Sequence, residues 1–324
     1  MRKYVIAIDL GGTNIKIAVV KDGRKIVNKI ILPTDLYKNK GALINGLSQL
    51  SLEIIKYSKI KKRDILGIGI GTPGLIDSRR GIIHRLVNIK GFKDVPLKRL
   101  MEKKTGIQTF LDNDVNIMTL GELHYGAGRG AKNMVCITLG TGVGGGIVID
   151  GRLYRGSCLS AGEIGHMPLN EHGPRCNCGG FGCMEKFVGN KYIIGAAVTK
   201  IKKGKKSIIK KMVGGDLRKI TPEIISRAAG NRDRLAVSIW EDVGSHLGVT
   251  LAGVINLLNP EKIVIGGGVS GAGRLLFETI RKTVKERAMK MPAKYAKIVK
   301  AKLGPDAGLI GAAVLVRLGK NDAN

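Results

Sequence analysis

The sequence predicts an α/β protein built from two related lobes. Segments with strand-like and helix-like patterns alternate along the 324 residues, which is typical of α/β folds. An apolar strand, a glycine-threonine turn and a second apolar strand occur in YVIAIDLGGTNIKIAVV at residues 4–20 and again in VCITLGTGVGGGIVID at residues 135–150. Such a repeat indicates two lobes of similar construction. No low-complexity linker divides the chain, so we expect the lobes to pack around a central cleft.

Residues 4–8 and 15–20 are compact β-branched runs on either side of the first glycine pair, and they predict a hairpin. Apolar residues at helical spacing predict a helix over about residues 41–59. Residues 65–70 form an apolar run before a Gly-Thr-Pro-Gly loop, which indicates a buried strand that ends at a ligand-accessible turn. A further short strand is expected at residues 108–111.

In the second half, Thr221-Pro222-Glu223 has the cap, first-turn proline and early acid of a helix start. Residues 235–258 predict a long buried helix in which Gly244 and Gly248 allow close packing. A short strand at 263–265 should run into a glycine triplet and then a helix.

The C-terminal apolar segment at residues 307–316 is expected to be a helix that packs back on the first lobe. We therefore predict a small lobe from residues 1–117 with 305–324, and a large lobe from 118–304.

The composition favours a soluble, cytoplasmic protein. The chain is 44% hydrophobic, which is ample for two cores, and its first apolar run is broken by Asp9 too early for a signal peptide. No apolar segment is long enough to span a membrane. The net charge of +30 suggests nucleic acid, but the lysines are spread along the chain and aromatic residues make up only 4%. We expect a solvated basic surface that binds neither nucleic acid nor membrane and that attracts anionic substrates such as ATP.

The segment at residues 163–185 sets one histidine and three cysteines where one Zn²⁺ ion could hold them. His166, Cys176, Cys178 and Cys183 supply one nitrogen and three sulfurs, which suits a closed structural zinc site. Glycines at 179, 180 and 182 allow the tight turns that this convergence needs. The alternatives are buried small apolar cysteines or a disulfide.

Three glycine-rich turns follow three buried strands, and together they predict a nucleotide site. Glycine turns let backbone N–H groups face phosphate oxygens, and threonine hydroxyls add donors. Neither common phosphate-loop motif is present. The expected nucleotide-binding residues are Asp9, Gly11, Gly12, Thr13, Thr141, Gly142, Gly266, Gly267 and Gly268.

These motifs resemble those of the ROK family of sugar kinases and repressors. AIDLGGTNIK, LGTGVGGG and IVIGGGV are similar to the two phosphate motifs and the adenosine motif of the actin-like sugar-kinase superfamily, and GEIGH followed by CNCGGFGC is similar to the ROK signature. The resemblance runs from about residue 5 to residue 313. It implies two ribonuclease-H-like lobes of the actin-like ATPase type and transfer of the ATP γ-phosphate to a sugar. Family repressors carry an extra DNA-binding domain, and its absence here favours a kinase.

The resemblance also assigns roles to residues. The LDNDVN segment makes Asp114 the expected general base, which caps a helix beginning near Val115. Asp9 is expected to hold Mg²⁺ through water, and His166 to bind zinc through one ring nitrogen while the other faces the sugar. The expected sugar-binding residues are Gly74, Asn88, Asn113, Asp114, Glu163, His166 and Glu185.

Two departures from the family pattern bear on substrate choice. Val87-Asn88 stands where Pro-Asn is common, and Asp112 begins the acid-Asn-Asp triplet. We predict an ATP-dependent hexokinase that phosphorylates the 6-hydroxyl of glucose. The alternatives are a kinase for an N-acetylhexosamine, mannose or fructose, a sugar-sensing regulator without catalysis, and a basic nucleic-acid-binding protein. The resemblance further implies a homodimer or homotetramer.

Overall fold

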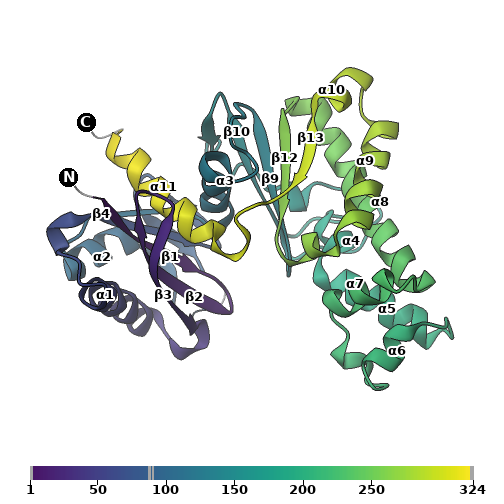
Figure 1. Cartoon of the computed structure of the whole chain (residues 1–324), viewed down its shortest axis with the longest axis horizontal. Helices are drawn as coiled ribbons and strands as arrows, with labels where there is room; N and C mark the ends of the chain where they lie inside the picture. The colour runs from purple at the N-terminus through teal and green to yellow at the C-terminus, as the bar shows by residue number, and fades with distance from the viewer. Residues whose placement is uncertain (1–2, 87–88, 90, 322–324) are drawn as a thin grey trace. The chain divides into compact units, whose positions relative to one another are not determined.

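The computed structural model describes residues 3–86, 89 and 91–321 (Figure 1). The chain forms two compact units. The first unit comprises Met1–Gly130, Gly146–Ala161 and Lys302–Asn324, and the second comprises Ala131–Gly145 and Gly162–Ala301. The boundaries predicted from the sequence, 1–117 with 305–324 and 118–304, stay a prediction.

The first unit is organised by a five-stranded sheet with strand order β3-β2-β1-β4-β8. Strands β1, β2 and β3 pair antiparallel, whereas β1 with β4 and β4 with β8 pair parallel. The bounds are Tyr4–Leu10 for β1, Asn14–Lys21 for β2, Lys25–Pro33 for β3, Ile65–Thr72 for β4 and Thr109–Asn113 for β8. The predicted first hairpin and both later strands are therefore present, together with β3.

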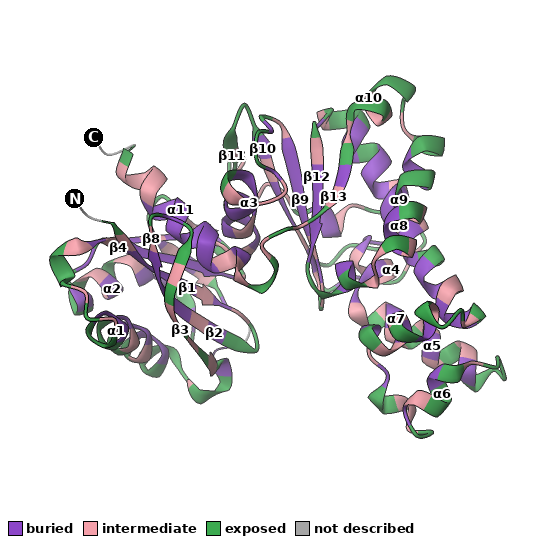
Figure 2. Cartoon of the chain, viewed as in Figure 1, coloured by how far each residue is buried: buried purple, intermediate pink, exposed green. Residues whose placement is uncertain are grey.

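Alternation along β1 supplies both faces of this sheet with apolar side chains. Ile6 and Ile8 lie in one core with the helices α1 (Lys40–Tyr57) and α2 (Leu97–Thr105). Val5 and Ala7 lie in the other core with α3 (Asp114–Tyr125) and α11 (Ala307–Asn321). Successive strand residues point to opposite faces, so one strand serves two helical layers. The outer positions of α1 are exposed or half-buried (Figure 2).

Helix α11 confirms the expected return of the C-terminal segment to the first unit. It packs against α3, β4 and β1, and its residues Leu309 to Val316 are buried. Figure 1 shows α11 (yellow) lying beside β1 and β4, which come from the opposite end of the sequence.

The first unit also contains a small three-stranded antiparallel sheet, ordered β5-β6-β7. Its strands are Leu75–Asp77, Ile82–Arg85 and Lys93–Val95. The sequence did not predict it, because runs of three or four residues are too short to establish an alternating pattern.

The second sheet repeats the strand pattern of the first, with order β11-β10-β9-β12-β13. Strand β12 pairs parallel with β9 and β13, and β10 pairs antiparallel with β11. The bounds are Met134–Leu139 for β9, Val143–Ile149 for β10, Arg152–Tyr154 for β11, Lys262–Gly266 for β12 and Lys297–Lys300 for β13. This repetition confirms the two related halves, and the chain passes from the second unit to the first within β10.

Helices make up most of the rest of the second unit. They are α4 (Glu185–Val188), α5 (Asn190–Lys202), α6 (Ile208–Met212), α7 (Pro222–Gly230), α8 (Arg234–Leu258), α9 (Arg274–Arg287) and α10 (Lys290–Tyr295). Short 3₁₀ turns are Thr34–Leu36 and Lys62–Asp64 in the first half, then Ile164–His166, Leu217–Lys219, Gly268–Ala272 and Gly304–Asp306. None of the helices in the described ranges is both long enough and apolar enough to cross a membrane.

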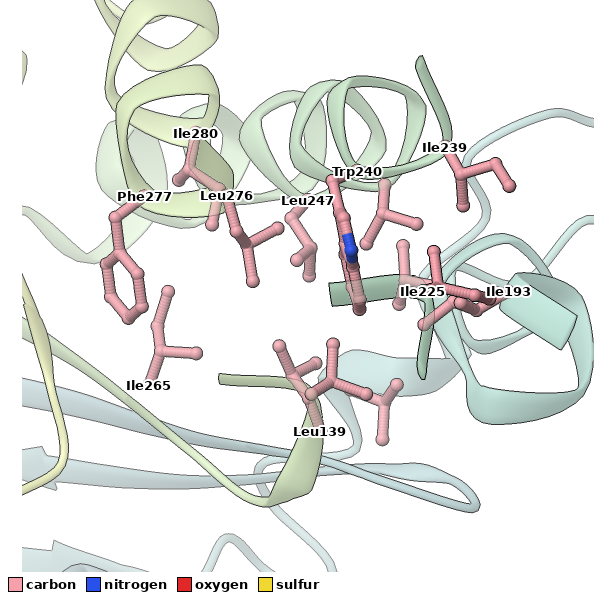
Figure 3. Close-up of a cluster of buried hydrophobic side chains, with 14 of the residues drawn as sticks. Leu139, Ile193, Ile225, Ile239, Trp240, Leu247, Ile265, Leu276, Phe277 and Ile280 are labelled. Atoms are coloured by element: carbon pink, nitrogen blue, oxygen red, sulfur yellow. The ribbon is translucent and has the colours of Figure 1, made fainter. Parts of the chain in front are cut away.

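The core of the second unit gathers around Trp240 of α8 (Figure 3). Leu139 and Ile265 come from β9 and β12, while Leu276 and Ile280 come from α9. Helices α8 and α9 approach closely because α8 carries glycines at the contact, as the sequence indicated. A Cβ placed on Gly244 would lie 2.7 Å from Cβ of Thr279, and one on Gly248 would meet Thr283.

A buried carboxylate ties the first unit together where the chain leaves it and returns. Glu122 of α3 is fully buried. Its carboxylate accepts the N–H of Ala127 at 2.7 Å, of Lys302 at 3.0 Å and of Leu303 at 2.8 Å. Ala127 precedes the exit of the chain after Gly130, and Lys302 marks its return. Glu122 therefore fixes the first exit and the last return of the chain to the same helix.

We predict that Glu122→Gln destabilises the protein by about 1–3 kcal/mol, because the amide replaces an acceptor oxygen with a donor that faces backbone N–H groups. Thermal unfolding measures this loss. The control Glu286→Gln, on an exposed position of α9, should change stability by no more than about 0.5 kcal/mol. Equal melting temperatures for the two variants would contradict the anchoring role of Glu122.

Candidate functional site

Parallel strand pairing brings the predicted residues of the first unit to one edge of its sheet. Asp9 of β1 stands beside Gly71 of β4, and Thr72 of β4 stands beside Asn113 of β8. The carboxyl ends of β1, β4 and β8 therefore meet, and the loops that follow them carry the predicted site. Ligands of open α/β sheets bind at such edges.

The turn between β1 and β2 contains Gly11, Gly12 and Thr13. The N–H of Gly11 donates to the carbonyl of Asn14 at 3.0 Å, which closes the turn. Thr34 holds it from outside, since its hydroxyl donates to the carbonyl of Gly11 at 2.8 Å and its N–H to the carbonyl of Thr13 at 2.9 Å. Gly12 and Thr13 stay exposed at the tip, where they can receive a ligand.

Asp9 forms an ion pair that the sequence analysis did not identify. Lys16 Nζ lies 3.1 Å from Oδ2 of Asp9 and donates to the carbonyl of Pro305 at 2.9 Å. The register of the hairpin places Lys16 directly opposite Asp9, so counting outward from the turn would have found the pair. Gly308 of α11 also adjoins Asp9, and a Cβ placed there would lie 2.8 Å from Cγ of Asp9.

The predicted catalytic segment lies where β8 ends and α3 begins. The expectation that Asp114 caps this helix is wrong, because the N-cap is Asn113, whose Oδ1 accepts the N–H of Val115 at 2.9 Å and of Asn116 at 3.4 Å. Asp114 is the first residue of α3, and its Oδ1 accepts the same Val115 N–H at 2.9 Å. The partial positive charge of a helix N-terminus favours a carboxylate at this position.

Gly74 occupies the turn between β4 and β5 with φ of 102°. This conformation favours glycine, and a Cβ placed there would collide with the carbonyl of Arg85. Asn88, the other predicted sugar contact from this region, lies outside the described residues.

In the second unit, the turn between β9 and β10 is bonded to another predicted site residue. Oε2 of Glu185 accepts the N–H of Val143 at 2.9 Å. A Cβ placed on Gly142 would lie 2.6 Å from that same oxygen. Asn190 donates its N–H to the carbonyl of Gly140 at 3.0 Å. Thr141 is therefore held in a turn that Glu185 and Asn190 brace, a link with no local signal in the sequence.

The glycine triplet of residues 266–268 begins with the last residue of β12 and ends with the first residue of the 3₁₀ turn Gly268–Ala272. Gly267 has φ of 81°, and a Cβ placed on it would collide with the carbonyl of Leu139 at the end of β9. Parallel pairing sets Gly266 beside Thr138. The triplet and the turn at 140–142 thus lie at the same edge of the second sheet.

The four predicted zinc ligands lie together in the second unit. Every ligand atom of His166, Cys176, Cys178 and Cys183 lies within 4.8 Å of the others. Nδ1 of His166 is 3.6 Å from Sγ of Cys176, and the Sγ atoms of Cys178 and Cys183 are 3.6 Å apart. Tetrahedral zinc with its usual bond lengths separates nitrogen from sulfur by about 3.6 Å and sulfur from sulfur by about 3.8 Å. The donor set therefore fits one zinc ion.

The thiols of this cluster differ in acidity. Burial, followed by the hydrogen bonds that the protonated Cys183 thiol forms with Cys178 and Cys176, raises the pKa of Cys183 to about 12. The backbone N–H of Gly180 lowers the pKa of Cys178. A coordinating metal ion deprotonates such thiols outright.

The structure does not contain the alternative of a disulfide, because the five cysteines all lie in the described ranges and are free.

His166 turns its two ring nitrogens in different directions. While Nδ1 faces Cys176, Nε2 lies 3.9 Å from Oε2 of Glu163. The Glu163 side chain is 64% exposed. A metal ion bound by the cluster would thus orient the His166 ring. Nε2 of this ring stands beside the exposed carboxylate of Glu163.

Arg155, which was not among the predicted site residues, forms an ion pair with Asp112 at 2.7 Å in the first unit. The two residues are 43 positions apart, and neither belongs to a repeat or a motif that would indicate the pairing. Only the fold of the chain after β10 reveals it.

The repeated sheets, the glycine turns at their edges and the carboxylate at the start of α3 define an α/β protein of the actin-like ATPase fold. The sequence profile of the ROK family matches residues 5–318. The chain belongs to the ROK family, as the resemblance indicated.

Individual relatives are similar over nearly the whole chain. A protein named glucokinase from Halalkalibacterium halodurans is 41% identical over 325 residues, which span 98% of this chain and 96% of that protein. A solved structure of a ROK family glucokinase from Streptomyces griseus, in complex with glucose and AMPPNP, has a TM-score of 0.84 at 30% identity and covers 98% of this chain and 100% of its own. A solved ROK family transcriptional regulator, a homologue of the E. coli MLC protein, has a TM-score of 0.89 at 28% identity. It covers 98% of this chain and 78% of its own.

We predict opposite effects of alanine at two helical glycines. Gly308→Ala should cost about 1–3 kcal/mol, because the new methyl group overpacks against Asp9. Gly253→Ala in α8, where a Cβ meets nothing within 4 Å, should stabilise by about 1 kcal/mol through helix propensity. Thermal melting distinguishes them. A stabilising Gly308→Ala would show that Asp9 is free to move away from α11.

Proposed function

We propose that this protein is an ATP-dependent hexose kinase that transfers the γ-phosphoryl group of ATP to the 6-hydroxyl of glucose. The observation that carries the proposal is 41% identity to a protein named glucokinase over nearly the full length of both chains. The S. griseus relative, whose complex holds glucose and an ATP analogue, supports the same pair of substrates.

Asp114 is the proposed general base. Its place at the first turn of α3 favours the ionised carboxylate, which can accept the proton of the attacking sugar hydroxyl. An aspartate has this role in protein kinases. Asn113, held by its cap hydrogen bonds, is proposed to contact the sugar next to Asp114.

The remaining sugar contacts are proposed to come from hydrogen-bond acceptors and from the turn at Gly74. A carboxylate accepts strong hydrogen bonds from sugar hydroxyls and penalises an analogue that lacks one. Exposed Glu163, beside His166, supports such a contact. The full proposed set is Gly74, Asn88, Asn113, Asp114, Glu163, His166 and Glu185.

The nucleotide is proposed to bind at the glycine turns of both sheets. The exposed tip at Gly12 and Thr13 and the braced turn around Thr141 offer backbone N–H groups to phosphate oxygens. Asp9 would hold Mg²⁺, which would neutralise charge at the phosphates. Lys16 keeps the Asp9 carboxylate in place.

The histidine-cysteine cluster is proposed to bind structural zinc. The four residues would hold the ion with protein ligands alone, which would leave no open position for chemistry. The chain next to the proposed zinc ligands also carries a residue that braces a neighbouring turn. Cys183 is followed after one residue by Glu185, whose carboxylate braces the turn at Val143.

A second candidate is a sugar-sensing regulator without catalysis, which the high TM-score to a transcriptional regulator favours. Mannose, fructose and N-acetylhexosamines remain alternative substrates. We further propose that the protein is cytoplasmic, forms a homodimer or homotetramer, and binds neither nucleic acid nor membrane.

We predict that Asp114→Asn lowers kcat for glucose by about 10²–10⁴-fold, because it removes the general base. Product formation is measured with ATP and a panel of glucose, mannose, fructose, N-acetylglucosamine and N-acetylmannosamine. The matched control Asp35→Asn, an exposed carboxylate of the turn Thr34–Leu36, should keep the activity of the unchanged protein. Sugar binding without turnover by the unchanged protein would favour the regulator. Full activity of Asp114→Asn would refute the assignment of the base.

We predict about one zinc ion per chain in the purified protein, and its loss together with stability in Cys178→Ser. Cys158→Ser is the matched control, because Cys158 is exposed and outside the cluster. Metal analysis and thermal melting are the measurements. Zinc-free protein with full stability and full activity would overturn the structural role of the metal.

A further inference from the structure

Asp112, two residues before the proposed base, is a buried carboxylate with both oxygens engaged. Its side chain is only 3% exposed. Oδ1 accepts the N–H of Asn113 and the side-chain Nδ2 of Asn116, each at 2.8 Å. The same carboxylate therefore holds the N-cap residue of α3 and the first turn of that helix.

The other oxygen of Asp112 is held by Arg155. Nε and Nη2 of Arg155 donate to Oδ2 at 2.8 Å and 2.7 Å. Arg155 directly follows β11 (Arg152–Tyr154), and both residues belong to the first unit. Two donors on one rigid guanidinium fix direction as well as charge, which a single ammonium group does not.

Arg155 also closes a constrained loop. Its carbonyl accepts the N–H of Ala161 at 2.9 Å. Within that loop Leu159 has φ of 64°, a conformation that bulky residues rarely adopt. In sequence, the loop leads directly to Glu163. Arg155 thus joins the start of this loop to the strand end that precedes Asp114.

Loss of the guanidinium would leave a buried carboxylate without a counter-charge. Such a group either takes up a proton or turns toward water, because an unpaired buried charge is strongly unfavourable. Either response weakens its hydrogen bonds from Asn113 and Asn116. The start of α3, and with it Asp114, would then lose its fixed position.

We propose that Arg155 is a positioning residue for the phosphoryl transfer, acting through Asp112 on Asn113 and Asp114; this inference rests on the proposed kinase function. Arg155 keeps the base in place and does not itself touch the reacting atoms. Its removal lowers kcat per folded molecule and leaves the KM for ATP unchanged. A purely structural ion pair would lower the melting temperature without this split.

The experiment compares the unchanged protein with Arg155→Met, Arg155→Lys, Asp112→Asn and the double variant Asp112→Asn/Arg155→Met. Arg152→Met, an exposed arginine of β11, is the matched control. Glucose phosphorylation is measured well below the melting temperature of each variant, with KM for ATP determined separately.

Arg155→Met is expected to lower kcat by about tenfold to hundredfold, the cost of a small misplacement of a catalytic group. The kcat of Arg155→Lys should fall between those of Arg155→Met and the unchanged protein, because lysine keeps the charge and loses the paired donors. The double variant should recover part of the kcat lost in Arg155→Met, because a neutral amide needs no counter-charge. Arg152→Met should stay within about twofold of the unchanged protein.

Equal kcat for Arg155→Met and Arg152→Met would overturn the positioning role, and so would independent, additive effects of the two substitutions. Absence of turnover by the unchanged protein would overturn the proposed kinase and this inference with it. Turnover by the unchanged protein with no effect at Arg155 would overturn the inference alone.

Discussion

Parallel pairing of the central strands is the constraint on which the rest of the structure depends. In the first unit β1, β4 and β8 run in the same direction, and in the second unit so do β9, β12 and β13. Their carboxyl ends must then open at one edge of each sheet, whatever the loops contain. The glycine turns, Asp9 and Asp114 all follow from this placement, because each stands at the end of one of these strands or just beyond it.

Polar side chains at these edges, half-buried except for the buried Asp112, determine how the loops are held. Lys16 fixes Asp9, Arg155 and Asp112 fix the start of α3, and Glu185 fixes the turn before Val143. Each of these charged groups forms a hydrogen bond with the backbone or an ion pair with an opposite charge. A low local dielectric makes such contacts strong when complete and costly when one partner is removed. Pre-organisation of this kind suits a reaction in which positioning and charge stabilisation are the protein's main contributions.

The sequence predicted the features that have a local signal, and it missed those that depend on distant partners. The glycine-centred hairpins, the long helix over 235–258 and the returning C-terminal helix all have periodic patterns, and all are present. The histidine-cysteine cluster was predictable because its four ligands lie within 18 residues, from 166 to 183. The small sheet β5-β6-β7 has strands too short for a pattern, and the pairing of Arg155 with Asp112 arises only once β11 has folded back. The sequence predicted the helix cap at Asp114, one residue after the observed cap Asn113, because Asn and Asp are nearly equal as caps.

Phosphorus NMR of a mixture of the purified protein with ATP, Mg²⁺ and glucose tests the central claim most directly. The kinase account predicts the growth of a sugar monoester signal at the 6-position in step with the conversion of ATP to ADP. Unchanged ATP, or hydrolysis of ATP to inorganic phosphate with no sugar phosphate in the presence of glucose, would contradict it.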